Sequence, residues 1–212
     1  RRHKIYWRDW CADVGSSELP DLDSLFLVKS QTEALISMIN GINERRGLIL
    51  ITGESGTGKT TLLHYLQAKL AKRVKTIRLS RVSIFFREIL KQITQELGLP
   101  LGDETPAFFL SQLRTHLAEG LSRRENLAIF VDDAQNLNKE TFEELRVLSQ
   151  MQEGEVRLVQ IVLAGPPELE NLLGGESLRP LQRQIQIRLQ HHDLWPEESQ
   201  LVIEQRLQRA GR

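Results

Sequence analysis

The sequence predicts an α/β protein of the P-loop nucleotide-binding class, with a five-stranded parallel sheet that carries helices on both faces. Residues 53–60 read GESGTGKT and fit the phosphate-binding pattern G-x-x-x-x-G-K-[ST] at every fixed position. Apolar runs of strand length alternate with segments whose apolar residues have helical spacing. Residues 127–131 (LAIFV) are apolar throughout, which is typical of a parallel strand covered on both faces.

Composition narrows the class of protein. The 212 residues fit one α/β domain, or one domain with a small appendage. The formal net charge is zero, which argues against a broad nucleic-acid-binding face but not against a local one. Cys11 is the single cysteine, which is compatible with a reducing cytosol. The chain begins with Arg1 rather than Met, so we expect a fragment, a processed form or an engineered form.

Three regions are expected along the chain. Residues 1–24 read as an N-terminal extension, residues 25–190 as the nucleotide-binding core, and residues 191–212 as the start of a helical lid or a C-terminal helix. The first ten residues (RRHKIYWRDW) are basic and aromatic. They indicate either a docking arm or an ordinary extension that packs on the domain.

The first part of the core reads as helix, strand, loop and helix. Residues 30–40 have apolar residues at helical spacing, and residues 48–52 form an apolar strand. A helix over residues 59–72 ends in a basic turn, which suits a helix C-terminus. Residues 75–80 (KTIRLS) read as a second short strand. Residues 83–97 repeat the helical pattern until a glycine and a proline end it.

The middle of the core continues the alternation. Residues 105–118 predict a helix with Pro106 at its first position, where the missing N–H is no loss. The apolar strand over residues 127–131 follows. Residues 138–151 then predict a helix with Asn138 as its N-cap.

The last part of the core completes the sheet. Residues 156–164 (VRLVQIVLA) predict a strand, and residues 168–173 a short helix. Residues 184–189 (QIQIRL) alternate and predict a fifth strand at an edge, before a final helix over residues 197–208. Five strands separated by helices imply right-handed crossovers and a ligand at the carboxyl ends of the strands.

The phosphate-binding pattern predicts an ATP site. Its glycines let several backbone N–H groups point at one phosphate chain, and the helix that follows adds its positive end. Lys59 can reach the β- and γ-phosphates, and the Thr60 hydroxyl can bind Mg²⁺. A glycine-rich turn with a chance lysine is the alternative, which both flanking segments disfavour. The expected nucleotide-binding residues are Gly53, Glu54, Ser55, Gly56, Thr57, Gly58, Lys59, Thr60 and Thr61.

Two adjacent carboxylates follow the third strand. Asp132 can hold Mg²⁺ together with Thr60, directly or through water. Asp133 is either the general base that polarises the attacking water or a capping carboxylate with no catalytic role. Further along the chain, an arginine such as Arg183 could reach the γ-phosphate of a neighbouring subunit, and a solvated surface is the alternative.

The motifs together resemble the AAA+ ATPases of the ExeA, or general secretion pathway protein A, type. The resemblance covers roughly residues 25–207, and it is carried mainly by DAQNL at residues 133–137 and VLAGPPEL at residues 162–169. It implies the sheet order 5-1-4-3-2, ATP hydrolysis and nucleotide-controlled homo-oligomers. It also implies a place on the cytoplasmic side of the bacterial inner membrane, among proteins that assemble secretion, pilus or exopolysaccharide machinery.

Three departures from that family's pattern bear on hydrolysis. Asp133 replaces the usual Glu, Pro166 replaces the usual Gln, and the arginines of residues 182–185 are shifted. The helical lid is expected to be truncated or nearly absent. We therefore expect an Mg²⁺-dependent ATPase, and we expect slow turnover if hydrolysis depends on these three positions. The alternatives are a switch that binds ATP without hydrolysing it, and a DNA-binding regulator like the family's relatives in transposition.

Overall fold

The computed structural model describes residues 29–70, 74–79, 85–102 and 105–190. The expected N-terminal extension and the final helix over residues 197–208 lie outside these ranges. In the described part of the chain, no helix is long and apolar enough to cross a membrane.

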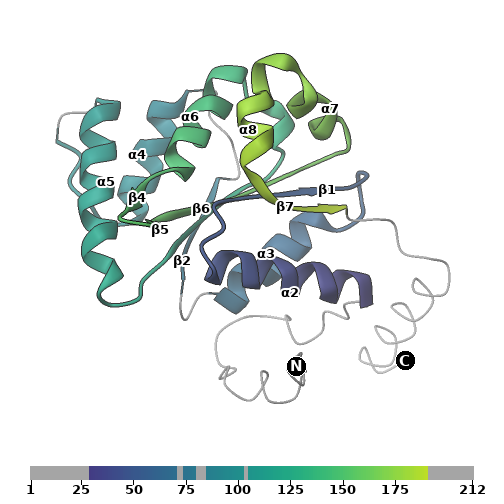
Figure 1. Cartoon of the computed structure of the whole chain (residues 1–212), viewed down its shortest axis with the longest axis horizontal. Helices are drawn as coiled ribbons and strands as arrows, with labels where there is room; N and C mark the ends of the chain where they lie inside the picture. Colours follow the sequence, from purple (N-terminus) through teal and green to yellow (C-terminus); the bar gives the residue numbers. More distant parts are fainter. Residues whose placement is uncertain (1–28, 71–73, 80–84, 103–104, 191–212) are drawn as a thin grey trace, which may run out of the picture.

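One parallel sheet organises the molecule (Figure 1). Its strands lie in the order β2–β3–β6–β1–β7, and every neighbouring pair is parallel. Numbered one to five along the chain, these strands have the predicted order 5-1-4-3-2, and the predicted α/β fold class is confirmed. The strands are β1 (Leu48–Thr52), β2 (Lys75–Leu79), β3 (Leu127–Val131), β6 (Val159–Gly165) and β7 (Ile185–Gln190).

Helices cover both faces of the sheet (Figure 1). One face carries α2 (Lys29–Asn43) and α3 (Lys59–Leu70). The other face carries the other α-helices of the described ranges, which are α4 (Phe86–Glu96), α5 (Pro106–Leu121), α6 (Lys139–Ser149), α7 (Glu168–Gly174) and α8 (Arg179–Gln184).

Two apolar cores follow from the strand pleat, because successive side chains point to opposite faces. In β1, Leu48 and Leu50 join the core under α4–α8, whereas Ile49 and Ile51 join the core under α2 and α3. All of β1 and all of β3 are buried, which explains why neither sequence alternates.

Helix caps agree with the sequence signals. Asn138 is the N-cap of α6, as predicted, and its side-chain oxygen accepts a hydrogen bond from the Thr141 N–H at 2.8 Å. Thr105 caps α5 and accepts from the Phe108 N–H at 3.3 Å, directly before the predicted Pro106. These side chains satisfy N–H groups that the helix itself leaves without partners.

The expected strand over residues 156–164 is wrong in its first part. There β4 (Gln152–Glu153) and β5 (Val156–Arg157) form an antiparallel hairpin, and the sheet strand β6 starts at Val159. The cause is a two-residue turn whose first residue, Gly154, has φ +58°. The short helix α8, with Pro180 in its first turn, was not predicted either.

A buried polar network ties the amino ends of the strands together. Gln160 of β6 has no exposed surface, and its Oε1 accepts a hydrogen bond from the Gly47 N–H at 2.8 Å. The Gln160 Nε2 donates to Asn126 Oδ1 at 3.3 Å, and the Asn126 amide donates to the Ile42 carbonyl at 2.8 Å. The network thus joins the start of three strands to the end of α2.

Candidate nucleotide-binding site

The phosphate loop connects β1 to α3 at the carboxyl end of the sheet. Gly56 and Gly58 have φ +88° and +95°, a conformation that side chains with a Cβ rarely adopt. A Cβ at either position would meet no other atom, so backbone conformation rather than space accounts for glycine here. Glu54, Ser55 and Gly56 are exposed, which leaves the loop backbone open to a ligand.

Lys59 is the first residue of α3 and turns back over the loop. Its Nζ donates hydrogen bonds to the carbonyl oxygens of Gly53 and Glu54, both at 2.7 Å. Both partners are neutral, so an anionic phosphate oxygen would be a stronger partner for the same ammonium group.

Thr60 and Asp132 meet beside the loop. The Thr60 hydroxyl donates to Asp132 Oδ2 at 2.9 Å, although 72 residues separate them in the chain. Asp132 directly follows β3 and is 7% exposed, and its Oδ1 accepts from the Asp133 N–H at 3.1 Å. A carboxylate and a hydroxyl are the oxygen ligands that Mg²⁺ prefers, so these residues fit the predicted metal.

Arg78 is a member of the site that we did not predict. Its guanidinium NH2 donates to Asp132 Oδ2 at 2.9 Å, and the two side chains are 19% and 9% exposed. A usable signal was present in the sequence. In the predicted sheet order β2 lies beside β3, and the register places Arg78 opposite Phe130, two residues before Asp132.

Asp133 lies at the surface in a left-handed conformation. Its φ is +52°, which Asp tolerates better than most residues. Gln135 donates from Nε2 to Asp133 Oδ1 at 3.3 Å. The carboxylate is exposed next to Asp132, so solvent can reach it.

Arg183 lies exposed on α8, which packs against α6, α7 and β7. Among the described residues it makes no hydrogen bond or ion pair with the phosphate loop. Pro166 is half-buried directly after β6. A second contact that we did not predict links β1 to α7, where the Thr52 hydroxyl donates to Glu170 Oε1 at 2.9 Å.

The pKa of His64 is affected by the charged residues of the site. It follows Thr60 by one turn of α3 and is exposed. Its pKa is lowered from the usual value by desolvation and, to a smaller extent, by the Arg78 charge, while Asp132 acts in the opposite direction. His64 is therefore mostly neutral at pH 7.

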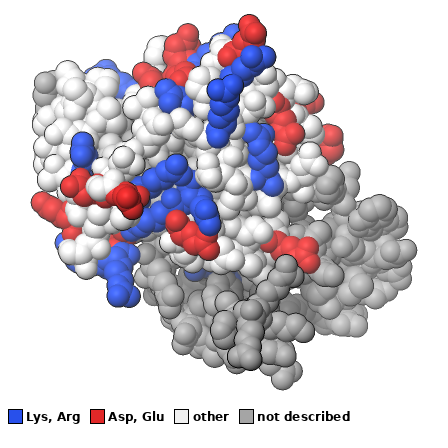
Figure 2. Space-filling view, in the orientation of Figure 1, with Lys and Arg blue, Asp and Glu red and all other residues white. Residues whose placement is uncertain are grey.

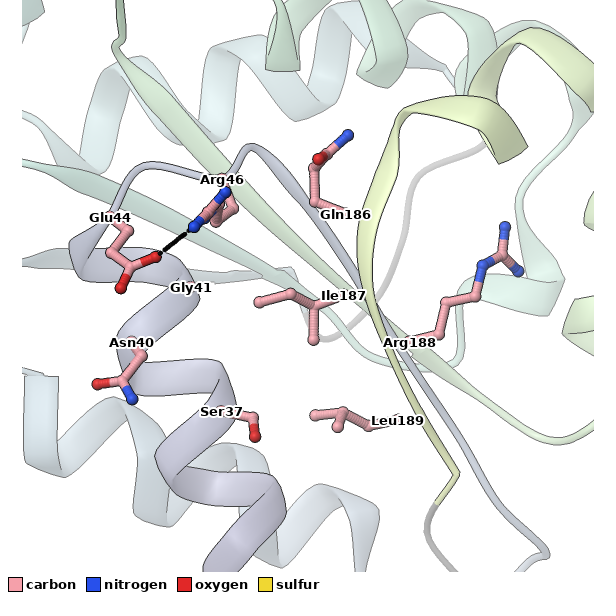
Figure 3. Close-up of a pocket in the computed structure, with 9 residues that line it drawn as sticks. All are labelled: Ser37, Asn40, Gly41, Glu44, Arg46, Gln186, Ile187, Arg188 and Leu189. Atoms are coloured by element: carbon pink, nitrogen blue, oxygen red, sulfur yellow. Dashed lines mark hydrogen bonds and ion pairs between the residues drawn. The ribbon is translucent and has the colours of Figure 1, made fainter. Parts of the chain in front are cut away.

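A separate groove of about 580 Å³ lies between α2 and β7 (Figure 3). Ile187 and Leu189 of β7 point toward α2, and Arg46 forms an ion pair with Glu44 at 2.8 Å at one end. The groove contains no residue of the phosphate loop, so it is distinct from the candidate nucleotide site.

This combination of sheet order and phosphate loop defines a class of protein. The AAA domain family matches residues 42–173, more than half of the chain, and the chain belongs to that family. The predicted resemblance is confirmed as well. The chain is 32% identical over 193 residues to general secretion pathway protein A of Aeromonas hydrophila, which covers 91% of this chain and 35% of that protein. It therefore spans about a third of that relative's length.

Solved structures with similar folds include ORC and Cdc6 proteins. Cdc6p of Pyrobaculum aerophilum matches with a TM-score of 0.69 and 17% identity, over 90% of this chain and 54% of that one. Drosophila ORC bound to DNA matches with a TM-score of 0.68 and 19% identity, over 95% of this chain and 50% of that one. ORC2 of Aeropyrum pernix matches with a TM-score of 0.65 and 20% identity, over 87% of this chain and 52% of that one. At these identities the likeness shows the fold alone.

Proposed function

We propose that this chain is an Mg²⁺-dependent ATP-binding and ATP-hydrolysing domain of a factor that assembles secretion, pilus or exopolysaccharide machinery. One observation carries the nucleotide part. Lys59 and the Thr60–Asp132 pair lie side by side at the carboxyl end of the sheet, on a glycine loop that opens a helix. The similarity to general secretion pathway protein A supports the assembly part.

Each residue of the loop has a role in this proposal. The backbone N–H groups of residues 54–61 hold the phosphates at the positive end of α3. Lys59 exchanges its two carbonyl partners for β- and γ-phosphate oxygens. Thr60 and Asp132 would hold Mg²⁺, which neutralises charge on the phosphate oxygens.

Hydrolysis needs a water activated near the γ-phosphate. Asp133 is the proposed general base, because it is an exposed carboxylate adjacent to the metal-binding Asp132. Arg183 is exposed on α8 and is proposed to act on the nucleotide of a neighbouring subunit, which makes hydrolysis depend on a homo-oligomer. The proposal places the domain in the cytoplasm, at the inner face of a bacterial inner membrane, with envelope assembly proteins as partners.

A Lys59→Ala variant tests nucleotide binding. We expect its affinity for a fluorescent ATP analogue with Mg²⁺ to fall at least about 100-fold, because the charged partner of the phosphates is lost. Lys69→Ala, near the other end of the same helix, is the matched control and should bind as wild type does. Equal binding by Lys59→Ala and wild type would show that the site is assigned wrongly.

Asp133→Asn separates the ATPase from a switch that binds without hydrolysing. If Asp133 is the base, phosphate release falls about 100-fold while ATP affinity changes less than about threefold. A wild-type rate indistinguishable from that of Lys59→Ala, with ATP still bound by wild type, would refute the enzyme and support the switch.

The DNA-binding alternative is tested in the same assay by adding duplex DNA. Among the described residues on the face shown in Figure 2, Lys and Arg side chains lie interspersed with Asp and Glu and form no broad basic surface. We therefore expect no change in ATPase rate with DNA. A salt-dependent shift of duplex DNA by the protein would contradict this expectation.

A further inference from the structure

The Asp132 carboxylate accepts three hydrogen bonds from other residues of the chain. Its Oδ2 accepts hydrogen bonds from both Thr60 and Arg78, each at 2.9 Å. Its Oδ1 accepts from the Asp133 N–H at 3.1 Å. Arg78 therefore binds the same carboxylate oxygen that the proposed function assigns, with Thr60, to Mg²⁺.

The Arg78–Asp132 contact compensates a charge that is otherwise poorly solvated. The Asp132 side chain is 9% exposed, and a buried carboxylate without a cation is costly. A bare carboxylate here would also repel the triphosphate that the loop binds. The guanidinium removes both penalties while no metal is present.

Arg78 also keeps an unused donor. Its Nε is buried and has no hydrogen-bond partner among the described residues, although most buried polar atoms are paired. The backbone of Arg78 is held in register with Phe130, and its carbonyl accepts from Gln92 Nε2 at 3.3 Å. The strand therefore fixes where the side chain starts, while its donors are not all committed to one arrangement.

We propose that Arg78 is a positioning residue that neutralises Asp132, so that the site keeps part of its affinity for ATP without Mg²⁺. In the metal-free site the guanidinium neutralises Asp132. A Mg²⁺ ion held by Asp132 would compete with Arg78 for Oδ2, because both are cations that interact with one carboxylate oxygen. This inference rests on the proposed ATP site and adds a role for Arg78 in it.

The test compares nucleotide affinity with and without metal. A fluorescent ATP analogue is titrated into wild type and Arg78→Ala, in EDTA and in saturating Mg²⁺. In Arg78→Ala the affinity in EDTA falls about tenfold, because Asp132 is left as a bare charge. The affinity in Mg²⁺ changes less than about threefold, so stimulation by Mg²⁺ rises at least about threefold.

Three further variants separate this role from a structural one. Arg78→Lys keeps the charge and should restore most of the affinity in EDTA. Arg78→Gln removes the charge with less loss of packing, so it should show the same loss of affinity in EDTA. It takes the place of Arg78→Ala in the test if the alanine variant does not fold. Arg114→Ala, an exposed arginine on α5, is the control and should leave the ratio unchanged.

A double-mutant cycle identifies Asp132 as the group through which Arg78 acts. In an Asp132→Asn background, Arg78→Ala should leave Mg²⁺ stimulation unchanged, because no charge remains to neutralise. If ATP binding depends on Lys59 but both Arg78→Ala and Arg78→Gln stay within twofold of the wild-type ratio, the role of Arg78 is refuted and the ATP site stands. If Lys59→Ala binds as wild type does, the ATP site itself is refuted.

Discussion

His64 lies one helical turn from the candidate metal ligand Thr60. Its lowered pKa makes the stability of the folded chain depend on pH. Because the folded pKa lies below the unfolded one, the unfolded chain binds more protons as pH falls from about 7.5 to 5.5. Stability contributed by neutral His64 is therefore lost on acidification. His64→Gln should lose less thermal stability than wild type between pH 7.5 and 5.5.

Thermal unfolding at the two pH values measures this difference. The expected effect is below about 0.5 kcal/mol, because His64 is exposed. His116→Gln on α5 is the control for the loss of a histidine. An equal or larger acid loss in His64→Gln than in wild type would contradict the assigned cause.

At the residue scale, local pattern made some of the site predictable. The phosphate loop is contiguous, and Asp132 follows an unmistakable buried strand, so both could be found from the sequence. Arg78 contacts Asp132 from 54 residues away, and Glu170 contacts Thr52 from 118 residues away. Such pairs depend on which strands become neighbours, and no spacing rule within one segment contains that information.

At the element scale, a substitution of Gln160 measures how much a buried polar side chain between neighbouring elements stabilises the fold. Gln160→Leu removes the acceptor of the Gly47 N–H and leaves that donor buried. We expect the free energy of unfolding to fall by about 1–3 kcal/mol. Urea unfolding measures it, with Gln152→Leu on the exposed hairpin strand β4 as the control. A loss within about 0.5 kcal/mol for Gln160→Leu would show that the network adds nothing to stability.

Elements with a complete periodic pattern were predicted well, and those built from few residues were not. The helices repeat their apolar stripes over several turns, and the buried strands are continuous apolar runs of strand length, so both can be recognised. The β4–β5 hairpin has two residues per strand, too few for an alternating pattern to be recognised. Helix α8 has six residues, too few for a stripe to repeat.

At the scale of the whole molecule, ligand binding should stabilise the fold by mass action. ATP with Mg²⁺ at 100 times its Kd should add about 2.7 kcal/mol to the free energy of unfolding. For a chain of this size that corresponds to a Tm rise of about 5–10 °C. EDTA should reduce the shift, and Lys59→Ala should abolish it. An equal rise in Lys59→Ala would mean that the stabilisation comes from another site.

The sheet order was predictable only through the family resemblance. The strand sequences establish that five parallel strands exist, but buried apolar runs such as LILIT and LAIFV can pair with one another in many orders. The order β2–β3–β6–β1–β7 places β1 between the two strands that follow latest in the chain.

The position of β1 between β6 and β7 has a consequence for biosynthesis. Leu48 pairs with Ile161 and Ile185, so β1 has no strand partner until more than 110 further residues have been made. At about 5–20 residues per second, the wait is on the order of 10 s. During that time the segment LILIT, apolar and rich in β-branched residues, is available to other nascent chains. Early docking of α2 and α3 on one face of β1, or a bound chaperone, would protect it before the sheet closes.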